Sequence, residues 1–221
     1  MFDIKEKLQE ELENITENLM LYNTETPVVK QKVNIYNTEN KYKIIYADPP
    51  WTFKTYSNKG KQKSAENHYP CMRKDEIQQL PVQNIADDDC VLFLWATFPC
   101  LQEAMELIKA WVFTYKTCAF TWVKKNRKSD SLFWGLGYWT RSNAEICLLA
   151  TKGHPKRISK SVHSVVIERV AEHNKKPDIV RDRIVSLCGD LPRIELFARQ
   201  YAEGWDCFGN QLPPVETGGL W

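Results

Sequence analysis

The chain has 221 residues, of which 43% are apolar and 26% charged, and its formal net charge is +2. This length suits one α/β domain with an extension, and the composition is that of an ordinary globular protein. So small a net charge argues against a polybasic tail but leaves room for a local basic groove. The seven cysteines contain no CxxC pair, so we expect buried thiols in a reducing cytoplasm rather than a disulfide framework or a zinc site.

The N-terminal region is predicted to form a helix followed by a linker. Within residues 3–21, apolar side chains recur at helical spacing, at Ile4, Leu8, Leu12, Ile15 and Leu19. Packing of this helix on the domain is favoured over a partner-binding role. Residues 22–41 are polar and indicate a linker or a weak strand around 32–36. The start of the chain is too charged for a signal peptide, and the longest apolar run, 90–102, is too short to span a membrane.

From residue 42 onward, the pattern alternates between strands and helices. Strands are expected at 43–48, 90–97, 117–123, 145–151, 162–167, 192–197 and 205–209, and helices at 73–80, 99–110 and 177–188. Continuously apolar strands indicate a sheet that is covered on both faces. The prediction is therefore an α/β fold with a mostly parallel sheet and helices on both faces. Ligands of such folds bind beyond the carboxyl ends of the strands.

The stretch Asp48-Pro49-Pro50-Trp51 lies at one such end, directly after an apolar run. Two prolines cannot continue a sheet, so they make a stiff, extended step. This step presents a carboxylate, a fixed carbonyl and a large aromatic face. The two oxygens can accept the hydrogens of an exocyclic amine on a nucleobase, and the indole can stack on the ring. The interpretation is transfer of an electrophilic group to nitrogen; the alternative is a tight turn that ends the strand.

Two long polar stretches, 52–68 and 124–141, are candidate binding loops. The second combines basic residues with an aromatic cluster at 133–139, and a further basic stretch follows at 152–160. Contact with a nucleic-acid backbone is favoured over simple solvated faces, with Lys124 and Arg141 as candidate substrate contacts. The chain has no phosphate-binding glycine loop, and its four histidines lack metal-ligand spacing, so no metal is expected.

Several short blocks together resemble one known family. They are DPPW at 48–51, HYP at 68–70, LFLWAT at 92–97, WVK at 122–124, NKKPD at 174–178, RIELFAR at 193–199 and GNQL at 209–212. In this order and spacing they resemble the MT-A70 family of adenine-N6 methyltransferases, especially its compact bacterial and phage members. The similarity runs from about residue 42 to 213.

The resemblance implies a Rossmann-like S-adenosylmethionine-dependent fold with permuted motif order, in which the catalytic motif comes first. It divides the chain into a helix and linker at 1–41, a methyltransferase domain at 42–213 and a tail at 214–221. The implied reaction is transfer of a methyl group from S-adenosylmethionine to the N6 amine of adenine in nucleic acid.

Carried over by position, the resemblance also implies the roles of individual residues. Asp48 would grip the target amine and lie near the methionine end of the cofactor, the Pro49 carbonyl would be the second acceptor, Pro50 would hold the turn, and Trp51 would stack on adenine. The implied cofactor contacts are Lys176 to the carboxylate, Glu195 and Phe197 along the pocket, and Arg199, Asn210 and Gln211 around the ribose and adenosine. Tyr69 and Glu145 would lie on the target-base side, and Asn34 and Ile35 are candidates for the cofactor's adenine.

Some of these roles have independent physical support, and one segment departs from the family pattern. Lys176 directly precedes Pro177 and a predicted helix start, where an anion is favoured. Asn210 and Gln211 carry amides that can donate and accept towards hydroxyls. Where eukaryotic RNA-modifying members have Pro-His-Asn after the arginine, this chain has residues 200–202, Gln-Tyr-Ala, which removes two ribose-contacting side chains.

DNA is favoured over RNA as the substrate, because the chain carries no RNA-binding zinc module and resembles bacterial and phage members. The alternatives are an RNA methyltransferase, a non-catalytic nucleic-acid-binding subunit, and methylation of a protein glutamine amide. The intact DPPW argues against a non-catalytic subunit, and the stacking face of Trp51 argues against methylation of a glutamine amide. We also expect the chain to form a homodimer or to pair with a sister methyltransferase subunit. We expect no contact with a membrane and a location in the cytoplasm of a bacterium or a phage-infected cell.

Overall fold

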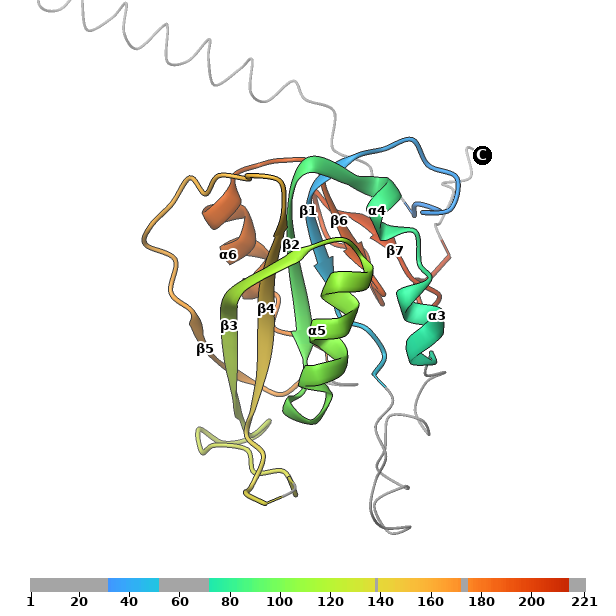
Figure 1. The fold of residues 1–221 in the computed structure, drawn as a ribbon. Coiled ribbons are helices and arrows are strands. Elements are labelled where there is room, and N and C mark those ends of the chain that lie inside the picture. The colour runs from blue at the N-terminus through green and yellow to red at the C-terminus, as the bar shows by residue number, and fades with distance from the viewer. Residues whose placement is uncertain (1–31, 52–71, 138, 172–174, 215–221) are drawn as a thin grey trace, which may run out of the picture.

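The computed structural model describes residues 32–51, 72–137, 139–171 and 175–214 (Figure 1). The helix predicted at 3–21 and the candidate residue Tyr69 lie outside these ranges.

A single seven-stranded sheet forms the centre of the fold, in the order β5-β3-β4-β2-β1-β6-β7 (Figure 1). The strands are β1 Tyr42–Ala47, β2 Ala86–Ala96, β3 Thr114–Lys125, β4 Ala144–Lys152, β5 Val165–Arg169, β6 Arg193–Leu196 and β7 Asp206–Phe208. Every strand expected between 43 and 209 is present, with its ends moved by a few residues. The predicted α/β class is confirmed.

The sheet is mixed rather than uniformly parallel, because β4 runs against both of its neighbours. The pairs β1–β2, β1–β6, β6–β7 and β3–β5 are parallel, whereas β2–β4 and β3–β4 are antiparallel. The sequence did not predict this reversal; β3 and β4 are consecutive strands that pair directly, without a crossover helix. As a result, the amino end of β4 lies at the edge where the other strands have their carboxyl ends.

Helices cover both faces of the sheet (Figure 1). They are α3 Lys74–Gln78, α4 Val82–Ile85, α5 Leu101–Ala110 and α6 Ile179–Cys188, with a 3₁₀ turn, η2 Phe98–Cys100, before α5. The helix predicted at 73–80 ends earlier, at Gln78, and α4 was not predicted. The helix predicted at 99–110 is divided into η2 and α5, with Pro99 in the 3₁₀ turn.

Strand side chains alternate between two cores, one on each face of the sheet. Ile45 and Leu92 join the helices α3, α4 and α5 in one core, whereas Tyr46 and Trp95 join α6 in the other. Within the described part of the chain, six cysteines are free and all but Cys118 are buried, as expected from their scatter. In the same ranges, no helix has the length and apolar character needed to cross a membrane.

The segment before β1 extends the sheet by one bridge rather than by a strand. Lys32 bridges Cys207, and the Val33 amide donates to the Cys207 carbonyl over 2.9 Å. The weak strand considered around 32–36 does not form. The Asn34 side chain accepts the Tyr36 amide at 3.1 Å, and such a local bond competes with strand pairing.

Candidate active site

Four charged side chains meet at the edge of the sheet where β1 ends. Asp48 follows β1, Lys124 lies near the end of β3, Glu145 lies near the start of β4, and Lys176 precedes α6. Lys176 Nζ lies 2.8 Å from Asp48 Oδ2 and 3.2 Å from Glu145 Oε2. Lys124 Nζ lies 2.5 Å from Glu145 Oε1. We call this alternating row of charges the Asp48 cluster.

The Asp48 cluster is largely shielded from water. The side chains of Lys176 and Glu145 are each 12% exposed, and that of Asp48 is 21% exposed. Burial raises the pKa of Glu145, but attraction by Lys176 and Lys124 outweighs burial and holds this pKa at about 2. Burial lowers the pKa of Lys176, but Asp48 and Glu145 outweigh it and raise this pKa above its ordinary value. Glu145 is therefore held as a carboxylate and Lys176 as an ammonium at neutral pH.

The register of the strands brings the cluster together. Glu145 pairs with Trp122, and Lys124, two residues further along β3, lies on the same face as a diagonal neighbour. The Lys124 ammonium lies 4.9 Å from the centre of the Trp122 ring, and that of Lys176 lies 5.5 Å from the Trp95 ring. Both lysines are thus held over indole faces, where a cation is attracted to the π-system.

The step after β1 is fixed by hydrogen bonds at both ends of Trp51. Its amide donates to the Pro49 carbonyl over 2.8 Å, and its indole Nε1 donates to the Trp95 carbonyl over 2.9 Å. The indole packs against the core on the α5 face. Because a carbonyl has two lone pairs, Pro49 keeps one for a further donor. The bond from Trp51 to Pro49 closes a short turn, and the bond to Trp95 fixes the indole.

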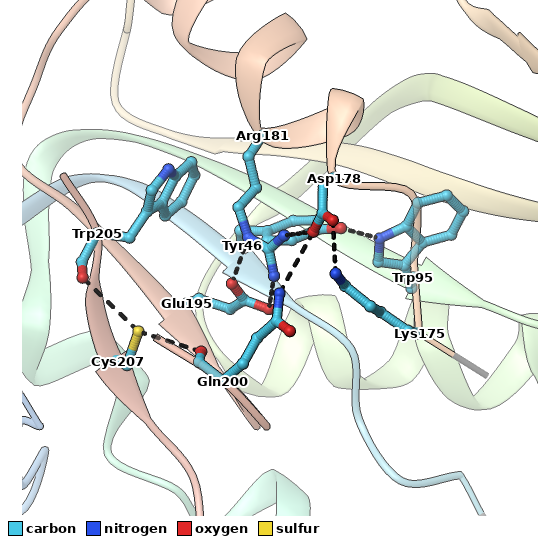
Figure 2. A network of polar contacts seen from close by, with 9 residues as sticks. All are labelled: Tyr46, Trp95, Lys175, Asp178, Arg181, Glu195, Gln200, Trp205 and Cys207. Carbon is cyan, nitrogen blue, oxygen red and sulfur yellow. Dashed lines mark hydrogen bonds and ion pairs between the residues drawn. The ribbon is translucent and has the colours of Figure 1, made fainter. Parts of the chain in front are cut away.

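A second charged cluster lies beside the first, around Arg181 of α6 (Figure 2). Arg181 donates through Nε and Nη2 to the two carboxylate oxygens of Glu195 on β6, over 2.7 and 2.9 Å. Its Nη1 donates to Asp178 over 2.6 Å, and its guanidinium lies 5.8 Å from the Tyr46 ring centre. We call this group the Arg181 cluster. It ties the start of α6 to β6.

The Arg181 cluster extends to segments that flank the Asp48 cluster. Asp178 also accepts Lys175 at 2.5 Å and Gln200 at 3.4 Å, and Figure 2 shows these side chains converging on it. Tyr46 in turn accepts the Trp95 indole N–H at 2.6 Å. Burial raises the pKa of Glu195, and the attraction of Arg181 opposes this rise. Sequence reasoning missed Arg181; its only signal was a cation between the apolar positions of an amphipathic helix.

The ends of β6 and β7 lie close together. Phe197, just after β6, has a φ of +61°, a left-handed conformation that is strained for a bulky residue. A Cβ on Gly209 would lie 2.1 Å from the Ala198 carbonyl oxygen, so only glycine allows this approach. Asn210 and Gln211 follow it with exposed side chains, and Arg199 lies next to Ala198.

Other predicted residues lie further from the clusters. Arg141 is exposed in the segment between β3 and β4, and Pro50 is half-buried in the step after β1. Ile35 is buried in the core on the α5 face, whereas Asn34 is exposed. Among the described residues, no group of three histidine, cysteine or acidic side chains is arranged to hold a metal ion.

Comparison with known proteins identifies relatives over most of the chain. Residues 42–211 match the family model described as MT-A70. The chain is 36% identical over 191 residues to the type II methyltransferase M.MunI of Mycoplasma sp, covering 78% of each protein. It is 29% identical over 179 residues to the N(6)-adenosine-methyltransferase subunit METTL3 of Danio rerio, and 28% identical to the METTL3 catalytic subunit of Homo sapiens. Those matches cover 79% of this chain but 29% of each METTL3, so the chain spans less than a third of these relatives.

Proposed function

The chain belongs to the MT-A70 family of S-adenosylmethionine-dependent adenine-N6 methyltransferases, and we propose that its substrate is adenine in DNA. The choice of DNA is supported by the relative named a type II methyltransferase, which matches at 36% identity and over 78% of both proteins. The METTL3 relatives, named as adenosine methyltransferases, match at lower identity and over 29% of their length.

One observation carries the proposal of a catalytic centre at Asp48. Its carboxylate accepts an N–H donor, the Lys176 ammonium, at 2.8 Å in a site that is only partly open to water. An adenine N6 amine is also an N–H donor, and its lone pair is delocalised into the ring. Asp48 and the Pro49 carbonyl would accept its two hydrogens, which favours a tetrahedral nitrogen and frees the lone pair. Asp48 need not act as a strong base, because the alkylated ammonium product loses its proton readily to water.

The donor set beside Asp48 suits S-adenosylmethionine. Lys176 is a buried cation between the carboxylates of Asp48 and Glu145. Such a row of opposite charges suits the amino acid end of S-adenosylmethionine, which carries one ammonium and one carboxylate. Lys176 would bind its carboxylate, and Asn210 and Gln211 would bind its ribose hydroxyls. Phe197 and Arg199 follow β6 at the same sheet edge and would line the adenosine end. When bound, this cofactor supplies an electrophilic methyl group whose sulfur leaves as a neutral thioether.

The structure suggests a different role for Glu195 from the direct contact implied by resemblance. Both of its carboxylate oxygens are taken by Arg181, so we propose that Glu195 supports the pocket through that pair. Tyr69 on the target-base side, a homodimer or sister subunit, and a cytoplasmic location stay predictions.

The deciding experiment measures transfer of labelled methyl from S-adenosylmethionine to duplex DNA, single-stranded DNA and RNA in parallel, with digestion to nucleosides. The expected product is N6-methyldeoxyadenosine, and the Asp48→Ala variant should form it about a thousandfold more slowly. N6-methyladenosine from RNA alone would overturn the choice of DNA. No product on any polymer, despite measurable cofactor binding, would indicate that a partner subunit is required.

A further inference from the structure

Large apolar side chains are concentrated in the segment between β3 and β4. Leu132, Trp134, Leu136 and Trp139 are 37%, 61%, 76% and 101% exposed. We call these four residues the aromatic turn. Single exposed apolar residues are ordinary, but several together on one turn mark a contact surface.

The aromatic turn rests on an ordered base. The Phe133 amide donates to the Lys124 carbonyl over 2.9 Å, and the Gly135 amide donates to the Ser142 carbonyl over 2.6 Å. The Asn143 amide group donates to the carbonyls of both Phe133 and Lys124. The backbone on both sides of Trp134 is therefore held to the end of β3 and to the residues just before β4.

A tight bend at Gly137 shapes the turn. Gly137 has a φ of +61°, and a Cβ there would lie 1.9 Å from the Thr140 carbonyl oxygen. Only glycine fits this backbone without displacing residue 140. The bend directly follows Leu136 in the chain.

The base of the turn adjoins the Asp48 cluster. Lys124, whose carbonyl holds Phe133, pairs through its ammonium with Glu145, and Glu145 pairs with Lys176. In Figure 1 the segment between β3 and β4 projects past the sheet edge towards which β1 points. The base of the aromatic turn thus adjoins the proposed catalytic centre, on the side of the sheet edge towards which the turn projects.

Cations lie on both sides of the aromatic turn. Arg127 and Lys128 precede it and Arg141 follows it, all with exposed side chains. Positive charge around exposed aromatic rings complements a polyanion with stacked bases, because phosphates meet the cations while rings meet bases. These flanking cations therefore favour a nucleic acid as the partner of the aromatic turn.

A target adenine in a duplex must leave the base stack to reach a partly buried carboxylate such as Asp48. Its departure leaves a gap in the stack. Proteins that distort duplex DNA insert apolar side chains between base steps and thereby hold them apart. We propose that the aromatic turn is such a wedge, which enters duplex DNA next to the target adenine and holds the gap open. This inference rests on the proposed function and adds to it the duplex as the physiological substrate.

The test compares one DNA sequence in two forms. Methylated sites are first mapped in DNA treated with the wild-type chain, and one mapped site is then prepared as a single strand and as a duplex. The wedge variant is Trp134→Ser, Leu136→Ser and Trp139→Ser. The matched control is Val112→Ser, Val165→Ser and Ile167→Ser, which removes three exposed apolar side chains outside the aromatic turn and the predicted binding stretches. If the wedge variant melts at a lower temperature than the wild type, Trp139→Ser alone replaces it. Trp139→Phe tests whether any aromatic ring at this position preserves the rate.

The wedge variant should lose about tenfold or more in kcat/KM on the duplex and change less than about twofold on the single strand. The control and Trp139→Phe should follow the wild type on both forms. If the wedge variant methylates the duplex as fast as the wild type does, the wedge inference is overturned and the proposed function stands. Equal losses on both forms, together with conversion of a dimer to a monomer in sedimentation, would make the turn a subunit interface. Failure of the wild-type chain to methylate DNA would overturn the wedge and the proposed function together.

Discussion

The Asp48 cluster and the Arg181 cluster lie side by side at one sheet edge but are built from different cations. In the first, two lysine ammonium groups pair in alternation with two carboxylates. In the second, one guanidinium holds Glu195 through two parallel hydrogen bonds. An ammonium is a point charge on a flexible stem that exchanges partners easily, whereas a guanidinium fork fixes its partner geometrically. We therefore expect the ion pairs of the Asp48 cluster, the reactive cluster, to rearrange when a ligand binds. We expect those of the Arg181 cluster, the scaffold cluster, to stay fixed.

The largest expected effect comes from removing the acid of the reactive cluster. Asp48→Ala should lower kcat/KM for methyl transfer about a thousandfold. The fold should persist, because Lys176 keeps Glu145 as a partner. Steady-state rates and thermal melting measure the two properties separately. Asp88→Ala, an exposed acid at the start of β2, is the matched control, and an Asp48→Ala variant of normal activity would contradict a catalytic centre here.

Substitutions in the Arg181 cluster should change the free energy of unfolding before they change activity. Arg181→Met leaves the Glu195 carboxylate buried without its main partner, which should lower the free energy of unfolding by about 3–5 kcal/mol. Adding Glu195→Leu removes the stranded charge and should recover much of this loss. Chemical denaturation measures both variants. If Arg181→Met melts like the wild type, the two clusters do not differ in the way proposed.

Lys176→Met should weaken binding of S-adenosylmethionine about tenfold or more, because a charge-assisted hydrogen bond is lost. Binding of DNA should change less, and calorimetric titration with each ligand compares the two. Lys116→Met, an exposed lysine on β3, is the control. An unchanged affinity for the cofactor would remove the proposed role of Lys176.

The same variant should flatten the acid dependence of stability. The pKa of Glu145 is held at about 2, below its ordinary value of 4.5. A lowered folded-state pKa stabilises the fold fully above the unfolded-state value and loses this contribution as the pH falls towards 2. Without Lys176, the folded-state pKa of Glu145 should rise and this pH-dependent part should shrink. Melting temperatures between pH 5 and pH 2 should therefore fall less steeply in Lys176→Met than in Lys116→Met.

The smallest effect is expected from Lys124→Met. Glu145 would keep Lys176 as its partner, and a methionine stem would still cover Trp122. We expect a loss of about 1 kcal/mol in the free energy of unfolding and little change in cofactor affinity. A loss of cofactor affinity as large as that of Lys176→Met would contradict the separate role proposed for Lys176.

Local patterns predicted the elements of this fold well, but not all their ends. The apolar runs of β1 and β2 are buried on both faces, so they read as strands without ambiguity. By contrast, α4 has only four residues, Val82–Ile85, which is too short for a helical period. Asn34 interrupts the expected strand at 32–36 through a side-chain bond that no periodicity reveals.

The candidate site was predictable where one residue or one short motif carried the signal. Asp48 was proposed from the strand end and the prolines, and Lys176 from the family resemblance, with support from its place before a helix. Arg181 was missed because its role depends on its ion pair with Glu195, a residue of β6 that lies near it only in the folded chain. The ion pair between Lys124 and Glu145 was not foreseen for the same reason, and the predicted contact of Lys124 with substrate stays a prediction.

The sequence by itself determined the alternation of strands and helices and the position of an acid and two prolines directly after β1. Only the tertiary structure decided which charges meet. Asp48 and Lys176 are 128 residues apart in the chain and 2.8 Å apart in space. Glu145 joins them because β4 runs in reverse and starts at the edge where β1 ends. Strand direction depends on pairing between whole segments, so no local pattern of residues encodes it.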